Sequence, residues 1–176
     1  AVALIFVAAA VFLVIGITTH EEPTFRSDAI QWAPEDFPLE VCASDRRGQL
    51  DDGPIRYVVQ TVNQRLDMAA LAYVGASEGC DVVITMGVPA EPGWMDPGGE
   101  ARWRPGGRVC YVSVSNVHGE MVTLVLYHEL GHCLGLDHDD YDQSIMRPVQ
   151  RETPDRAIPP WISDADRAAI RARYLP

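Results

Sequence analysis

The chain has 176 residues, 47% of them hydrophobic, a composition that is typical of globular proteins and excludes a disordered or collagen-like chain. Its 14 basic and 25 acidic residues give a formal net charge of −11 at pH 7. This charge argues against nucleic acid as a partner, because phosphate binding needs a basic face. The length predicts one main domain.

The first 17 residues carry no polar side chain. As a helix they would span about 25 Å, close to the thickness of a bilayer's hydrocarbon core. With Thr18 and Thr19, this run predicts a transmembrane anchor over residues 1–19. The alternative is a signal peptide, although its apolar region is usually about 7–15 residues long and ends at a small-residue cleavage site, which this flank lacks. Both interpretations place the rest of the chain outside the cytoplasm.

Residues 20–36 are polar and rich in proline, which is typical of a linker, so we expect the folded domain to span residues 37–176. Alternating or β-branched apolar runs within it predict strands separated by glycine-rich and proline-rich turns. The predicted strands cover residues 38–43, 71–74, 82–86, 100–104 and 109–114.

Three helices are predicted between and after these strands. The first begins near Pro54 and presents one apolar face, formed by Ile55, Val58, Val59, Val62 and Leu66. The second, over residues 121–136, is apolar on most sides and should be buried. The third begins with a capping-box pattern at Ser163 and ends near Tyr174. Strands and buried helices together predict an α+β domain, with helices packed on a sheet as in an α/β-type sandwich.

The most informative stretch reads His128-Glu129-Leu-Gly-His132-Cys-Leu-Gly135-Leu-Asp-His138. His128 and His132 are four residues apart, so on a helix they lie on one face and can bind the same metal. Gly135 can end the helix in a left-handed conformation. The chain then turns and can bring His138 back as a third nitrogen ligand.

Three histidines and a water can coordinate zinc tetrahedrally, and substrate can replace the water. This is the arrangement of catalytic zinc sites. Glu129 would lie beside the zinc-bound water and act as the general base. A closed structural site would need a fourth ligand such as Cys133, but a helix turns that side chain about 100° away from His132. A chance occurrence of this pattern is improbable, because a random sequence would match its five fixed residues at only about 3 in 10⁷ starting positions.

The run H-E-x-x-H-x-x-G-x-x-H, followed by Ser144-Ile-Met146-Arg-Pro148, resembles the zinc-binding segment and Met-turn of metzincin peptidases. The short spacing and the Met-x-Pro ending resemble the matrixin branch most. The resemblance implies a twisted, mostly parallel five-stranded sheet with an antiparallel edge strand. It also implies a backing helix, an active-site helix and a C-terminal helix.

The same resemblance assigns roles around the site. Gly135, Met146 and Pro148 would support it structurally, with Met146 lying below the zinc-binding histidines. A peptide or protein substrate would bind extended along the edge strand at residues 100–104. One catalytic zinc would be the cofactor. Calcium is possible but not predicted, because the acidic residues at 139–142 match no known calcium-binding loop.

The chain contains four cysteines, which fit either two disulfides or four buried thiols. A translocated chain meets an oxidising compartment, which favours disulfides. In the resembling fold, Cys42 and Cys80 flank neighbouring strands. This resemblance implies the pairs Cys42–Cys80 and Cys110–Cys133.

The sequence therefore predicts a zinc-dependent endopeptidase, either membrane-anchored or secreted. One alternative is a zinc-binding interaction domain of protease fold that has lost turnover, although the intact Glu129 disfavours it. Another is an amidase that acts on a cell-wall crosslink, but the sequence shows no sugar-binding module to support it.

Overall fold

The computed structural model describes residues 25–45, 48, 50–76, 78–88, 98–115, 119–138, 144–147 and 162–174. Its elements, in chain order, are η1 (Pro34–Asp36), β1 (Leu39–Asp45), α1 (Gly53–Leu66), β2 (Leu71–Gly75), β3 (Val82–Val88), β4 (Gly99–Trp103), β5 (Cys110–Ser115), α2 (Glu120–Cys133) and α3 (Asp164–Tyr174). Every predicted strand and helix is present, with bounds shifted by a few residues.

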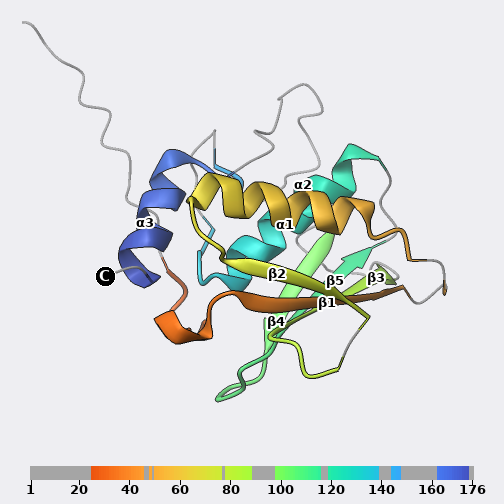
Figure 1. Cartoon of the computed structure of the whole chain (residues 1–176), viewed down its shortest axis with the longest axis horizontal. Helices are drawn as coiled ribbons and strands as arrows, with labels where there is room; N and C mark the ends of the chain where they lie inside the picture. The colour runs from red at the N-terminus through yellow and green to blue at the C-terminus, as the bar shows by residue number, and fades with distance from the viewer. Residues whose placement is uncertain are drawn as a thin grey trace, which may run out of the picture.

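The strands form one five-stranded sheet in the order β2-β1-β3-β5-β4 (Figure 1). β1 pairs in parallel with β2 and β3, and β3 pairs in parallel with β5. β4 is one of the two edge strands, with β2 at the other edge, and it runs antiparallel to β5. The predicted fold class, a mostly parallel sheet with one antiparallel edge strand, is therefore confirmed.

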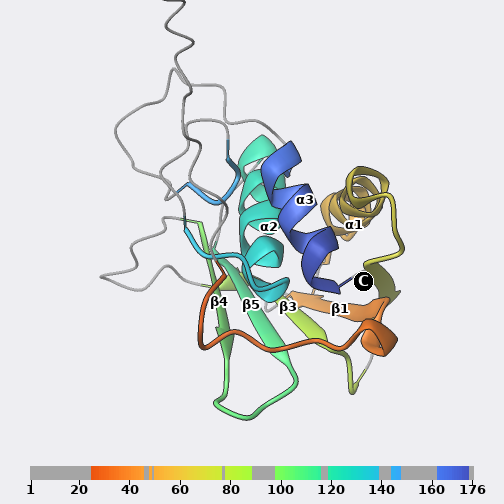
Figure 2. The ribbon, with the colours of Figure 1, turned by 90° about the vertical axis from the view of Figure 1, so that its left-hand side faces the viewer.

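Helices α1 and α2 lie on the same face of the sheet, as both ribbon views show (Figures 1 and 2). α1 buries the apolar face expected from the sequence pattern. α2 is buried along most of its length between α1 on one side and strands β4 and β5 on the other. It ends at Cys133, earlier than predicted, because Gly135 adopts a positive φ of 92° and turns the chain away from the helix axis.

Residues 25–36, which the sequence pattern assigned to a linker, pack against the domain. Ala29, Ile30 and Trp32 are buried, and Phe25 forms an antiparallel bridge with Leu136. The polar residues and Pro34 of this stretch indicated a linker, whereas its apolar residues follow neither a helical nor a strand period. Their burial depends on a surface that only the folded domain provides.

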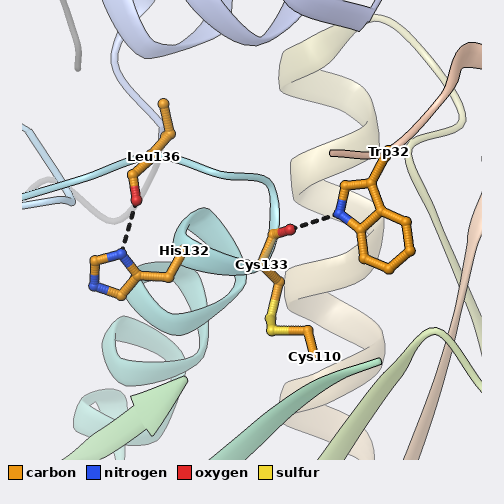
Figure 3. The surroundings of a disulfide bond; sticks show 5 residues. All are labelled: Trp32, Cys110, His132, Cys133 and Leu136. Carbon is orange, nitrogen blue, oxygen red and sulfur yellow. Dashed lines mark hydrogen bonds between the residues drawn. A yellow bond between two sulfur atoms is a disulfide. The ribbon is translucent and has the colours of Figure 1, made fainter. Parts of the chain in front are cut away.

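One of the two predicted disulfides is present, between Cys110 at the start of β5 and Cys133 at the end of α2 (Figure 3). The predicted Cys42–Cys80 pair is wrong, since both residues are buried thiols. The pairing of Val41 with Val82 places Cys80 beside residue 39, three residues along β1 from Cys42. Three residues of strand span about 10 Å, which is beyond the reach of a disulfide.

The predicted anchor at residues 1–19 lies outside the described ranges. Among the helices that the structure describes, none is both long and apolar enough to cross a membrane.

Candidate metal centre

The three histidines predicted as metal ligands come together at the end of α2. The Nε2 atom of His138 lies 3.1 Å from Nε2 of His128 and 3.1 Å from Nε2 of His132. The candidate ligand atoms of the three residues all lie within 4.8 Å of one another. His128 and His132 are buried within α2, whereas His138, beyond the turn at Gly135, is exposed. The site is thus closed on the protein side and open toward solvent.

Backbone carbonyls orient two of these rings. Nδ1 of His128 lies 2.7 Å from the carbonyl oxygen of Ile145, and Nδ1 of His132 lies 2.8 Å from that of Leu136. A carbonyl can only accept, so each Nδ1 carries the proton and donates it. Each Nε2 atom therefore presents a lone pair to the centre of the cluster, as a metal ligand must.

The geometry of the cluster fits zinc. Two nitrogens bound at about 2.0–2.1 Å in a tetrahedral site are about 3.3–3.4 Å apart, close to the 3.1 Å separations seen here. Nε2 of His138 can carry one proton, so without a cation it can donate to only one of the two lone pairs, on His128 Nε2 and His132 Nε2, that face it. A bound cation would instead accept a lone pair from all three nitrogens. Burial, and then the neighbouring His128 ring, lowers the pKa of His132 to about 3. That ring is therefore neutral and ready to bind metal at neutral pH.

Glu129 follows His128 on α2, and its side chain lies against the start of β4. Its side chain is buried, and a Cβ built on Gly99 at the start of β4 would lie 2.9 Å from the Glu129 Oε1 atom. The same Cβ would lie 2.5 Å from the Val125 Cγ1 atom. Only glycine lets β4 run this close to α2. The carboxylate is therefore held next to the strand along which a substrate is expected to bind.

Met146 lies in the turn at residues 144–147, directly against α2. The residue is fully buried, and a Cβ built on Gly131 would overlap its Sδ atom and lie 3.3 Å from its Cε atom. Gly131 sits between the two helical histidines in the sequence, so the methionine packs under the segment that carries them. This arrangement matches the supporting position expected for Met146. Pro148, the other residue predicted to support the site, lies outside the described residues.

We expect Gly131→Ala to lower the free energy of unfolding by about 1–3 kcal/mol, because the new methyl group overpacks against Met146. This loss exceeds the gain of about 0.5–1 kcal/mol that alanine usually brings to a helix. Urea unfolding would measure it. Gly53→Ala is the matched control, because its Cβ meets only the exposed Asp51 carboxylate, at 3.1 Å. Equal stability of wild type and Gly131→Ala would contradict the packing role of Met146.

The turn carrying Met146 is tied to α3 by a buried carboxylate that the sequence analysis did not single out. The backbone N–H of Met146 donates to the hydroxyl of Ser144 at 3.0 Å. That hydroxyl and the Ser163 hydroxyl both donate to Asp166 Oδ2, at 3.4 and 2.7 Å. Asp166 is 1% exposed. The capping pattern at Ser163 signalled the start of α3, but nothing in it indicated that the same carboxylate would hold the turn beside the histidines.

Comparison with known proteins identifies related sequences and folds. The model of the matrixin family matches residues 52–175. Archaemetzincin from Methanopyrus kandleri has a similar structure, with a TM-score of 0.57 and 16% sequence identity over 77% of this chain and 94% of that one. At 16% identity, this structural similarity establishes only the fold of the chain, which is metzincin-like as predicted.

Two further solved structures share the fold. A zinc-dependent peptidase from Methanocorpusculum labreanum gives a TM-score of 0.50 at 16% identity, covering 74% of this chain and 99% of that one. Myroilysin gives a TM-score of 0.50 at 11% identity, covering 78% and 83%. No curated protein sequence matches the chain significantly.

Proposed function

The chain belongs to the matrixin family, and from this premise we propose that it is a zinc-dependent endopeptidase with Glu129 as its general base. The fold and the three-histidine cluster are those of a zinc-dependent peptidase. The strongest support for the proposal is the arrangement of the histidine rings. The three Nε2 atoms converge at the spacing of a zinc site, and two of the rings are fixed in the metal-binding tautomer by backbone carbonyls.

His128, His132 and His138 would hold a zinc ion, which when bound would polarise the peptide carbonyl as a Lewis acid and lower the pKa of water toward neutrality. Glu129 takes the proton as the water oxygen bonds to the carbonyl carbon. As the carbon–nitrogen bond breaks, Glu129 passes this proton to the leaving amine. Burial of Glu129 beside β4 supports this assignment, because it keeps the carboxylate in one place relative to both the histidines and the strand.

Substrate binding is proposed along β4, at Gly99–Trp103. β4 is the edge strand next to Glu129, and an extended peptide can add to such an edge through main-chain hydrogen bonds. Its first residue lies against Glu129, so a peptide paired with β4 would pass close to the proposed base. An endopeptidase needs this kind of open, extended contact, because its substrate continues on both sides of the bond that is cleaved.

Removal of zinc tests the proposal. We expect the full chain, purified in detergent, to cleave internal bonds of an unstructured protein such as casein. A chelator should abolish cleavage, and one equivalent of zinc should restore it. Zinc uptake without cleavage of any peptide would instead identify a non-catalytic zinc-binding domain. Cleavage of cell-wall crosslinks, but not of proteins, would identify an amidase.

We further propose that residues 1–19 anchor the enzyme in a membrane, with the catalytic domain on the side away from the cytoplasm. The support is the apolar run over residues 1–17 and the absence of Lys and Arg from His20, Glu21 and Glu22, which follow it. After expression of the full chain, the enzyme should sediment with membranes and resist extraction by alkaline carbonate. A soluble mature protein whose first residue falls between Thr18 and Thr24 would show cleavage of a signal peptide instead.

A further inference from the structure

The turn that follows α2 leads to the third histidine, and three of its backbone carbonyls accept hydrogen bonds from distant parts of the chain. The carbonyl of Cys133 accepts a hydrogen bond from the indole N–H of Trp32 at 2.8 Å. That of Leu134 accepts one from the Tyr174 hydroxyl at 2.9 Å. The carbonyl of Gly135 accepts a hydrogen bond from the backbone N–H of Arg26 at 3.0 Å. The carbonyl of Leu136 accepts one from the ring of His132.

Two of these donors, Trp32 and Arg26, belong to residues 25–32, which we call the N-terminal strap. Trp32 is 5% exposed and reaches the helix end beside the disulfide, one residue beyond the ligand His132 (Figure 3). The carbonyl it binds is among the last of α2, which have no partner within the helix. A buried carbonyl without a donor is costly, so Trp32 completes the end of the zinc-binding helix.

The other end of the strap covers the turn. Phe25 pairs with Leu136 in a short antiparallel bridge. A Cβ built on Gly135 would lie 3.4 Å from the Phe25 ring and 3.9 Å from the Cβ of Ala29. The strap therefore packs on Gly135 and pairs with Leu136, the residue whose carbonyl orients His132.

The strap also contacts the edge strand. The indole N–H of Trp103, the last residue of β4, donates to the carbonyl of Asp28. The guanidinium of Arg26 lies 4.6 Å from the centre of the Trp103 ring, a cation–π contact. In the side view, the segment that begins at residue 25 runs beside β4 (Figure 2). One short segment thus bridges the metal-binding turn and the strand proposed to bind substrate.

From these contacts we infer that the N-terminal strap is a positioning element of the zinc site, with Trp32 as its principal positioning residue. Trp32 and the backbone of residues 25–26 hold the turn at 133–136, so that His132 keeps its orientation and His138 returns to the cluster. The inference rests on the proposed zinc site and adds a determinant of zinc affinity that lies outside the sequence motif.

Trp32→Phe tests it, because phenylalanine keeps a large aromatic ring but removes the N–H donor. Zinc affinity of the full chain, measured by competition with a chromogenic chelator, should fall about 10-fold, the lower end of what loss of an outer-shell partner costs. Trp103→Phe removes the hydrogen bond from the half-buried Trp103 side chain to the Asp28 carbonyl, which joins the strap to β4. It should cost about 5-fold, the value of one hydrogen bond.

Val58→Ala is the matched control. Val58 is fully buried on α1, so the variant loses stability in the same core without touching the turn. Its folded form should bind zinc as wild type does. Zinc affinity of Trp32→Phe and Trp103→Phe equal to that of Val58→Ala would overturn the inference and leave the proposed function intact. A wild-type chain that takes up no zinc would overturn both.

Discussion

Glu129→Gln is expected to lower kcat/KM for peptide cleavage by about 10²–10⁴-fold, the usual contribution of general acid–base catalysis. The amide is nearly the same size and shape as the carboxylate but cannot accept the proton of the attacking water. The three histidines are untouched, so the variant should bind one equivalent of zinc. Steady-state kinetics on a fluorogenic peptide and metal analysis of the same sample would measure both effects.

The matched control is Glu120→Gln, which makes the same chemical change at the exposed first residue of α2. It should leave kcat/KM unchanged. A loss smaller than 10-fold in Glu129→Gln would remove Glu129 from the role of general base. A fall in bound zinc would mean that the carboxylate supports the metal instead.

His138→Ala should weaken zinc binding by at least about 100-fold, more than the loss of an outer-shell partner usually costs, and peptide cleavage should fall to background at limiting zinc. His138 contributes the one exposed ligand, so truncation leaves no buried cavity. The apo variant should therefore unfold at nearly the same urea concentration as the apo wild type. Chelator competition and urea unfolding would separate the two effects.

His118→Ala serves as the comparison, since His118 lies outside the motif, and it should retain full zinc affinity. Unchanged zinc stoichiometry in His138→Ala would show that the metal is held by a different set of ligands. Uptake of two equivalents by the wild type would show a second metal site, such as the calcium site left open by the acidic residues at 139–142.

Much of the fold could be predicted because its signals are local. The apolar spacing of α1 follows from the helical repeat, and the strands from short β-branched runs between glycines. The capping pattern at Ser163 marked the start of α3, and its reciprocal hydrogen bonds with Asp166 are present. The two wrong predictions, the linker at residues 25–36 and the Cys42–Cys80 disulfide, concern features that depend on tertiary contacts. The stretch at 25–36, predicted as a linker, packs against the domain, and Cys80 lies out of register with Cys42.

The sequence by itself determined the three-histidine cluster, because the helical repeat and one glycine turn are enough to bring His128, His132 and His138 together. It also identified Glu129 as the candidate base, whereas the mixed sheet was predicted from the resemblance to metzincins. Only the tertiary structure decided what holds these residues in place. The carbonyls of Ile145 and Leu136, the contact of Gly131 with Met146, and the N-terminal strap leave no sequence pattern. Every residue has a carbonyl, and which ones meet a ring or an indole depends on packing between segments far apart in the chain.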